Sequence, residues 1–299
     1  MESYMSGTSE ADEICSAVTE TAGRLGIAFS RDKVWPILSA YGDAFAHAMP
    51  LAFRMATGPQ HAGDVDCRFI THPKDRNPYP LAVSKGLTPK TSHPVGTLLS
   101  EIEERFPIDG YGIDFGVVNG FTKVYAGFAP QDLQNASKLV EIPAMPRSLA
   151  GNFDFFVRHG LDDKVAFVAV DYLHRTVNVY FNDVPAACFE SDGIRRMLRD
   201  LGLPGPSDRM LGIGGQAFGL YITLNWDSPA IERFCFGVTT TDLSSLPVSI
   251  EPQLEKFAHC VPYGGADRKF VYGVAAAPEG EYYKLETHYK WNPGTVAFI

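Results

Sequence analysis

The segment YGIDFGVVNGFTKVYAGF, residues 111–128, contains two strand-like runs joined by a tight turn. Residues 111–118 and 122–128 are rich in β-branched and aromatic side chains, and the dipeptide Asn119-Gly120 lies between them. Asn-Gly is the strongest short-range signal for a β-hairpin, because both residues tolerate the positive φ that a type I′ turn requires. The segment therefore predicts a pair of antiparallel strands.

The same pattern recurs along the whole chain. Strand-like pairs occur at 51–57 with 64–71, 165–172 with 176–181, 216–226 with 231–239, and 269–276 with 282–289. Segments with helical periodicity lie before and between them, at 10–25, 30–47, 95–106, 148–161, 191–201 and 252–260. Five hairpins supply ten strands, and closure of such a sheet on itself removes its exposed edges. We predict an α+β fold with one domain over residues 1–299, a ten-stranded antiparallel closed barrel built from αββα repeats and ringed by helices. An open α+β sheet with one helical layer is the alternative.

The composition excludes several classes of protein. The 299 residues are 45% hydrophobic and 20% charged, with a net charge of −9, whereas a nucleic-acid-binding domain normally presents a basic face. No apolar run approaches the ~20 residues of a membrane-spanning helix, and the acidic N-terminus does not resemble a secretory signal. The five cysteines never stand in a CxxC spacing, so neither a disulfide framework nor a zinc site is indicated. We expect a monomeric cytoplasmic protein that binds neither membranes nor nucleic acids.

Polar side chains alternate with apolar ones along the strands, and residues i and i+2 lie on the same face of a strand. If helices cover the outside of the barrel, the apolar positions face them and the polar positions face inward. The polar positions include four cations and four tyrosines: Arg68, Lys123, Arg233, Lys284, Tyr125, Tyr180, Tyr221 and Tyr282. Cations and aromatic faces inside a barrel favour a phosphorylated ligand that also packs on aromatic rings. A polar face that is merely solvated is the alternative.

Several segments, in chain order, closely resemble the soluble bacterial aromatic prenyltransferases with the αββα (ABBA) barrel. They are DKVWPILSAYGD (32–43), VDCRF (65–69), GFTKVYAGF (120–128), DYLHRTVNVYF (171–181), LYITLNW (220–226), IERFCFGV (231–238) and EYYKL (281–285). The resemblance covers residues 11–289 and is nearest to the phenazine prenyltransferase branch. It implies transfer of a dimethylallyl or geranyl group from its diphosphate to a carbon of an aromatic acceptor, such as a (dihydro)phenazine carboxylate, in secondary metabolism. A hydroxynaphthalene or other phenolic acceptor is the alternative.

The resemblance also implies roles for individual residues. Lys123, Asn178, Tyr221, Arg233 and Lys284 match positions that bind the diphosphate. His174 stands where some members have a diphosphate-binding lysine, and Arg68 is assigned to the same group. Phe218, Gly219 and His288 match positions that contact the acceptor.

The residue types suit the chemistry that the resemblance implies. Departure of diphosphate from an allylic carbon produces an anion, which fixed cations stabilise, and an allylic cation, which aromatic faces stabilise and shield from water. The expected shield consists of Tyr125, Tyr180, Tyr221 and Tyr282. Glu286 lies two residues after Lys284 and on the same face, so it is the candidate base for the ring proton. A structural Glu286–Lys284 ion pair is the alternative, with water or His288 as the proton acceptor.

The resemblance bears on the metal requirement as well. In metal-dependent members, an aspartate matching Asp66 holds magnesium against the diphosphate. Asp66 is retained here, but Arg68 lies two residues later on the same face, and its guanidinium would supply the charge of the metal. We therefore expect no metal ligands and no required cofactor, with magnesium not essential. Pairing of Arg68 with Asp66, with the ion bound nearby, is the alternative.

Other functions fit the sequence less well. Isoprenoid chain-elongating enzymes use DDxxD motifs, whereas Asp162-Asp163 has no further acid at that spacing. The segment GIGG at 212–215 lacks the GK[ST] ending of a phosphate loop, and we interpret it as a turn that enters a strand. A non-enzymatic barrel that stores a small molecule would explain a chamber, but not inward cations beside a carboxylate.

Overall fold

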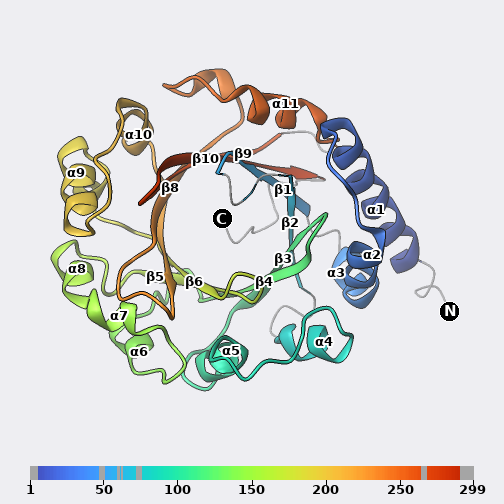
Figure 1. Cartoon of the computed structure of the whole chain (residues 1–299), viewed down its shortest axis with the longest axis horizontal. Helices are drawn as coiled ribbons and strands as arrows, with labels where there is room; N and C mark the ends of the chain where they lie inside the picture. The colour runs from blue at the N-terminus through green and yellow to red at the C-terminus, as the bar shows by residue number, and fades with distance from the viewer. Residues whose placement is uncertain are drawn as a thin grey trace.

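The computed structural model describes residues 6–46, 51–58, 61, 63–71, 76–263 and 268–289. Its ten strands form one closed antiparallel barrel, in which each strand pairs with its neighbours in the chain and β1 pairs with β10 (Figure 1). The segment at 111–128 forms β3 (Gly110–Gly116) and β4 (Gly120–Gly127), and Gly120 adopts a φ of 77° at the turn. The predicted fold class is confirmed.

The other strands follow the predicted pairs to within a few residues. They are β1 (Leu51–Ala56), β2 (Asp66–Ile70), β5 (Val165–Asp171), β6 (Thr176–Phe181), β7 (Gly219–Asn225), β8 (Arg233–Thr240), β9 (Phe270–Ala277) and β10 (Gly280–Tyr289). Each hairpin turn joins an odd-numbered strand to the next even one, so all five turns lie at one end of the barrel. We call this the turn end and the opposite end, where the helical connections begin and finish, the helix end.

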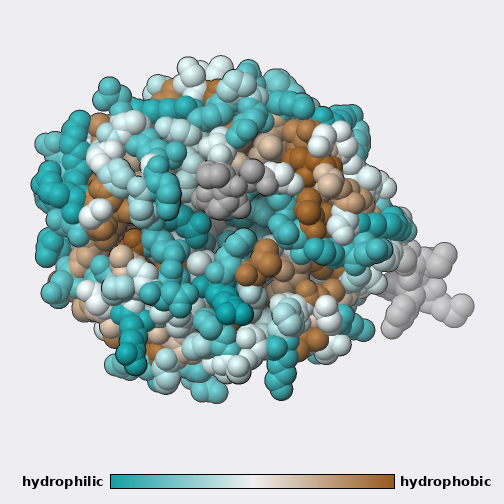
Figure 2. Space-filling view, in the orientation of Figure 1, coloured by the Kyte–Doolittle hydropathy of each residue, from teal (hydrophilic) through white to brown (hydrophobic). Residues whose placement is uncertain are grey.

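The helices surround the barrel (Figure 1). They are α1 (Ser6–Leu25), α2 (Arg31–Ala40), α3 (Gly42–Ala46), α4 (Tyr79–Ser84), α5 (Val95–Glu103), α6 (Ala136–Val140), α7 (Arg147–Gly151), α8 (Phe153–Arg158), α9 (Ser191–Asp200), α10 (Asp208–Gly214) and α11 (Pro252–Cys260), with short 3-10 helices η2 (Ala186–Cys188) and η3 (Leu243–Ser245). On the face drawn in Figure 2, hydrophilic residues predominate around the periphery of the molecule. Among the described helices, none has both the length and the apolar character needed to cross a membrane.

Some sequence predictions about helices were wrong in detail. The segment 148–161 forms two helices that meet at Asn152, whose side-chain amide donates hydrogen bonds to two backbone carbonyl oxygens. The segment 30–47 is likewise divided between α2 and α3, and His47 lies outside the described residues.

The interpretation of GIGG as a turn was also wrong for its first three residues. They end α10, which begins after Ser207, whose side chain accepts a hydrogen bond from Met210 N. Gly214 packs so closely against Ile194 of α9 that a Cβ atom would lie 2.2 Å from the Ile194 side chain. The glycine therefore serves helix packing and not a turn.

The hydrophobic core lies between the barrel and the helices. Along β5, Val168 and Val170 belong to this core, whereas Asp171 lines a cavity inside the barrel. Other strands contribute large outward aromatic side chains; Phe69, for example, lies 4.8 Å from Phe45 of α3 between ring centroids. Burial of apolar side chains outside the barrel leaves its interior to the polar positions, as the alternation predicts.

Candidate active site

Charged side chains of alternating sign line neighbouring strands inside the barrel. Arg54 of β1, for instance, lies opposite Glu286 of β10 on one side and Asp66 of β2 on the other. The set, which we call the charge belt, comprises Glu286, Arg54, Asp66, Arg68, Asp114, Lys123 and Asp171. Opposite charges on facing positions of adjacent strands stabilise a sheet, so the register of the barrel itself pairs these groups.

Asp114 of β3 lies at the centre of the charge belt and is fully buried. Its Oδ2 accepts hydrogen bonds from Arg54 and from the Tyr125 hydroxyl, both at 2.8 Å, and its Oδ1 accepts one from Arg68 Nε at 2.7 Å. Burial acts to raise the pKa of Asp114, but Arg68 and Arg54 outweigh it and hold the pKa well below its ordinary value. Two guanidinium groups and one carboxylate thus fix one another in place.

Arg54 also binds Asp66, whose Oδ2 accepts hydrogen bonds from Nε at 3.3 Å and from an NH2 group at 2.8 Å. The sequence prediction gave the place beside Asp66 to Arg68, and that was wrong, because Arg68 is directed to Asp114 and Glu286. The position facing Asp66 on the adjacent strand, Arg54, reaches the carboxylate more directly than a residue two positions along the same strand. Within the described part of the chain, no group of three or more His, Cys, Asp or Glu side chains is arranged to hold a metal ion.

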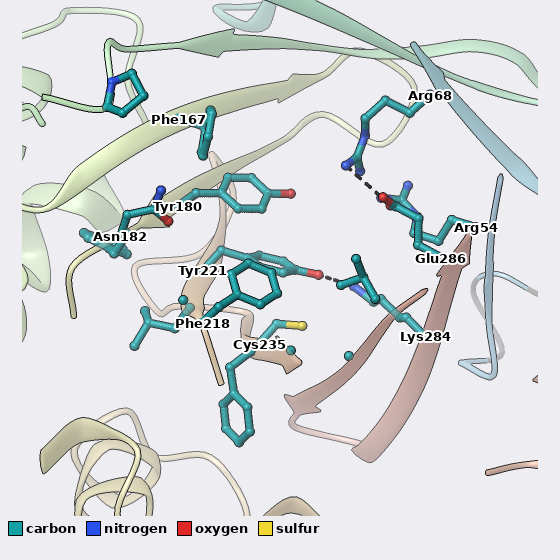
Figure 3. A pocket seen from close by; sticks show the side chains of 18 residues that line it. Arg54, Arg68, Phe167, Tyr180, Asn182, Phe218, Tyr221, Cys235, Lys284 and Glu286 are labelled. Atoms are coloured by element: carbon teal, nitrogen blue, oxygen red, sulfur yellow. Dashed lines mark hydrogen bonds and ion pairs between the residues drawn. The ribbon is translucent and has the colours of Figure 1, made fainter. Parts of the chain in front are cut away.

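Two cavities meet inside the barrel. The polar chamber, of about 270 Å³, lies toward the turn end, and its charged and polar lining includes Lys123, Asp171, His174, Asn178, Glu232 and Arg233. The apolar chamber, of about 240 Å³, lies toward the helix end, and its lining includes Phe167, Phe218, Gly219, Leu220, Gly237 and Val271, with Arg68 and Glu286 at one side (Figure 3). The residues common to both chambers are Arg54, Tyr180, Tyr221 and Lys284.

Tyr180 and Tyr221 form an aromatic wall where the chambers meet. Their rings stack with centroids 4.5 Å apart and an interplanar angle of 27°, and their hydroxyls point toward the side where Arg54 and Lys284 lie (Figure 3). Lys284 Nζ donates a hydrogen bond to the Tyr221 hydroxyl at 2.5 Å. Burial raises the pKa of both tyrosines well above the ordinary value, so both hydroxyls keep their protons and remain hydrogen-bond donors.

Lys123 and His174 share one carboxylate at the turn end. Asp171 lies 3.4 Å from Lys123 Nζ and 3.1 Å from His174 Nδ1. Burial acts to raise the pKa of Asp171, but Lys123 and His174 lower it to about 2. The hydrogen bond to Asp171 raises the pKa of His174, against the effect of burial. His174 therefore carries more positive charge near neutral pH than an ordinary histidine.

Arg233 and Lys284 stand apart from these pairs. Carboxylates of the charge belt neutralise Arg54 and Lys123, whereas Lys284 binds a tyrosine hydroxyl. Between the residues described in the structure, no carboxylate forms an ion pair with Arg233 or Lys284, and the neighbouring Glu232 accepts a hydrogen bond from Asn225. Their charges are available to an anion in the polar chamber.

Glu286 is 5% exposed and lines the apolar chamber. Its Oε2 lies 3.4 Å from a terminal nitrogen of Arg68, and its Oε1 lies 3.7 Å from His288 Nε2. The alternative of a Glu286–Lys284 ion pair is not observed, because Lys284 turns toward Tyr221. Burial lowers the pKa of His288, with Glu286 opposing it, which favours a neutral imidazole beside the carboxylate.

The structure brings most of the predicted site residues together. Six of the residues predicted to bind the diphosphate line the polar chamber: Lys123, His174, Asn178, Tyr221, Arg233 and Lys284. Arg68 lines the apolar chamber instead. Phe218 and Gly219, expected to contact the acceptor, line the apolar chamber, and His288 lies beside Glu286.

The expected aromatic shield is only partly assembled. Tyr125 packs on Tyr180 with ring centroids 5.9 Å apart. Tyr282 packs near Tyr221 but is not a lining residue of either chamber. It borders a third cavity between the β7–β8 and β9–β10 turns, which shares Glu232 and Arg233 with the polar chamber. Its position near the start of β10 explains this, because Tyr282 lies closer to the turn end than the wall does.

Three residues of the charge belt were not singled out from the sequence: Arg54, Asp114 and Asp171. Each has apolar neighbours on both sides, as in FRM for Arg54 and IDF for Asp114. A charge between two apolar residues of a strand is the signal that would have found them, since it places the charge on the inner face.

Comparison with known proteins agrees with this architecture. The family model described as aromatic prenyltransferase Orf2 matches residues 9–297. The chain therefore belongs to this family of transferases, which confirms the resemblance seen in the sequence.

Curated relatives match nearly the whole chain. The 5,10-dihydrophenazine-1-carboxylate 9-dimethylallyltransferase of Streptomyces anulatus is 46% identical over 96% of this chain and 96% of its own. The furaquinocin biosynthesis prenyltransferase of Streptomyces sp. (strain KO-3988) is 44% identical over 93% of this chain and 90% of its own. The flaviolin linalyltransferase of Streptomyces virginiae is 43% identical over 96% of this chain and 95% of its own.

The role of Asp114 leads to a prediction about stability. Replacement of Asp114 by Ala leaves two buried guanidinium groups without their shared counter-charge, and we expect the free energy of unfolding to fall by about 3–5 kcal/mol. Urea denaturation measures the change. Glu141→Ala, which removes the 72% exposed partner of Arg105, is the control and should cost ~1 kcal/mol or less. Equal losses in the two variants would contradict the central place given to Asp114.

Proposed function

We propose that the protein transfers a dimethylallyl or geranyl group from its diphosphate to a carbon of an aromatic acceptor. The observation that carries this proposal is the meeting of a cation-lined chamber and an aromatic chamber at the wall of Tyr180 and Tyr221. An allylic diphosphate has a highly charged end and an apolar end, and the two chambers match these ends. The wall is then the place where the bond between them breaks.

The polar chamber binds the diphosphate in this proposal. Arg233 and Lys284 supply charge that no carboxylate neutralises in the described chain, while Asn178 and the Tyr221 hydroxyl supply neutral hydrogen-bond donors. As the carbon–oxygen bond breaks, its electron pair leaves with the diphosphate. Cations fixed before the reaction stabilise that charge without reorganisation.

The acceptor lies in the apolar chamber, between Phe218 and the aromatic wall. A ring carbon attacks the allylic cation, which the faces of Tyr180 and Tyr221 stabilise and shield from water. The new carbon–carbon bond leaves a proton on the ring, and Glu286 accepts it to restore aromaticity. Arg68 lies beside one oxygen of the Glu286 carboxylate and His288 beside the other, so the two residues orient the carboxylate.

We propose a dihydrophenazine carboxylate as the first candidate acceptor, because the relative named for that substrate is 46% identical. A hydroxynaphthalene or another phenol is the second candidate, since a 43% identical relative is named for flaviolin. We also propose that the enzyme works as a monomer in the cytoplasm: the closed barrel has no free strand edge, and its five thiols are free, as is usual in a reducing compartment.

Incubation with dimethylallyl diphosphate or geranyl diphosphate and a panel of aromatic acceptors tests the proposal. The panel contains 5,10-dihydrophenazine-1-carboxylate, flaviolin and a dihydroxynaphthalene, and mass spectrometry reports the products. We expect one acceptor to gain the mass of the isoprenoid group, with release of pyrophosphate. An acceptor that binds but never gains mass would indicate a carrier and contradict transfer.

The diphosphate-binding role of the two unpaired cations can be tested separately. Arg233→Ala and Lys284→Ala each remove a positive charge that would stabilise the leaving diphosphate. We expect turnover to fall at least ~10²-fold, the scale of a lost preorganised electrostatic contact. Steady-state kinetics gives the values. Arg195→Ala, on the exposed face of α9, should turn over like the wild type. Wild-type rates in both chamber variants would refute the assignment.

Magnesium should not be required for turnover. Asp66, the carboxylate matching the metal-binding position of other members, already binds Arg54, whose fixed charge takes the place of an ion. We expect the rate to persist in excess EDTA. Loss of nearly all activity, with recovery on addition of magnesium, is the outcome that excludes this view.

Glu286→Gln preserves the shape of the side chain and removes its ability to accept the ring proton. We expect kcat to fall by about 10²–10⁴-fold, the range for a positioned acid–base group, while the KM for the acceptor changes much less. Glu279→Gln at the exposed β9–β10 turn is the matched control. Normal turnover by the Glu286 variant would leave water or His288 as the base.

A further inference from the structure

A histidine and a tyrosine lie side by side at the turn end. His61, in the connection between β1 and β2, lines the polar chamber, and its ring centroid is 5.6 Å from that of Tyr282 on β10. Both His61 Nε2 and the Tyr282 hydroxyl are buried, and neither has a hydrogen-bond partner among the residues that the structure describes. Buried polar atoms are normally partnered. The unpartnered Nε2 of His61 at the polar chamber, next to Tyr282 at the adjoining cavity, therefore indicates that a ligand completes its bond.

Four cations act on His61. They are Lys284, Arg54, Lys123 and Arg233, and together with burial, which is the largest cause, they lower the pKa of His61 to about 2. The other titratable groups that line the chamber are Asp66, Asp171, His174, Glu232, Tyr180 and Tyr221. At neutral pH His61 is thus an uncharged imidazole with one N–H group.

Tyr282 extends the same arrangement. It is 6% exposed, and its ring lies 5.1 Å from Lys284 Nζ. Burial acts to lower the pKa of Arg233, but Tyr282 and Tyr221 are the neighbours that do most to raise it. Tyr282 therefore lies beside both of the cations that carboxylates leave unneutralised.

We propose that His61 is a further binding residue for the diphosphate of the donor, with Nε2–H donating a hydrogen bond to a phosphoryl oxygen and the Tyr282 hydroxyl donating beside it. This inference rests on the proposed function, in which the diphosphate occupies the polar chamber. It gives Tyr282 a place at the leaving group instead of at the allylic cation.

A neutral donor has a physical advantage at this position. A fifth cation would repel the four already present whenever the donor is absent, and the protein would lose stability. An imidazole N–H and a phenol O–H add hydrogen bonds to the anion without that repulsion. Hydrogen bonds to charged groups are the stronger kind, so the effect on affinity is measurable.

Calorimetric titration of the full chain with inorganic pyrophosphate at pH 7 tests the inference without any turnover. We expect His61→Ala to raise the Kd by about 10- to 100-fold, the equivalent of one hydrogen bond to a charged group. His61→Gln, which keeps an N–H donor, should restore most of the affinity, and Tyr282→Phe should weaken binding to a smaller extent. His259→Ala, at an exposed position of α11, should bind like the wild type, and thermal unfolding verifies that each variant is folded.

Arg233→Ala, titrated in parallel, separates this inference from the proposed function. If Arg233→Ala loses affinity while His61→Ala binds like the wild type, the inference is overturned and the diphosphate site stands. If both bind like the wild type, the polar chamber is not the diphosphate site, and the proposed placement of the donor fails as well. Equal losses in His61→Ala and His61→Gln also overturn the inference, because the N–H group would then not be the cause.

Discussion

One carboxylate closed off from water, Asp114, holds two guanidinium groups inside the barrel, and the rest of the interior is arranged around that contact. A ten-stranded barrel is too wide for side chains alone to fill, and charges placed in its interior need partners. The charge belt supplies those partners through strand register, since each charged residue faces an opposite charge on the next strand. Arg54, Arg68 and Lys123 are thereby paired with carboxylates, whereas Arg233 and Lys284 are left out of the belt.

On the proposed function, this division also explains how two adjoining chambers serve two kinds of chemical group. A diphosphate is stable where fixed positive charge replaces its water, whereas an allylic cation survives only where water is absent. The aromatic wall of Tyr180 and Tyr221 lies between these surroundings, because both tyrosines line the apolar chamber and the polar chamber. The reacting bond would lie across this wall, with its two products drawn into different surroundings.

Local features of the sequence predicted most of the fold and part of the site. Asn119-Gly120 and the strand-like pairs located all ten strands, because hairpins and alternation are local properties. The bond from Arg54 to Asp114 was beyond such reasoning, since the two residues lie on β1 and β3, which do not pair. The register of Arg54 with Glu286 was equally hidden, because closure of the barrel brings β10 to β1 from the far end of the chain. The level of Tyr282 was also hidden, for a related reason: alternation gives the face on which a side chain lies, but not its level along the barrel axis. The break at Asn152 depends on a bond to Pro229, far away in the sequence, and helical periodicity contains no information about it.

The alternation of the strands has a consequence for how such enzymes diversify. Outward residues such as Val168 and Phe69 build the annular core with the helices, while inward residues of the strands line the two chambers. Mutations at inward positions outside the charge belt can therefore change what the chambers admit with less effect on folding than mutations in the belt, and mutations at outward positions can drift without altering the chemistry. Relatives named for a dihydrophenazine carboxylate and for flaviolin, both more than 40% identical to this chain, are what evolution under these separable constraints would produce.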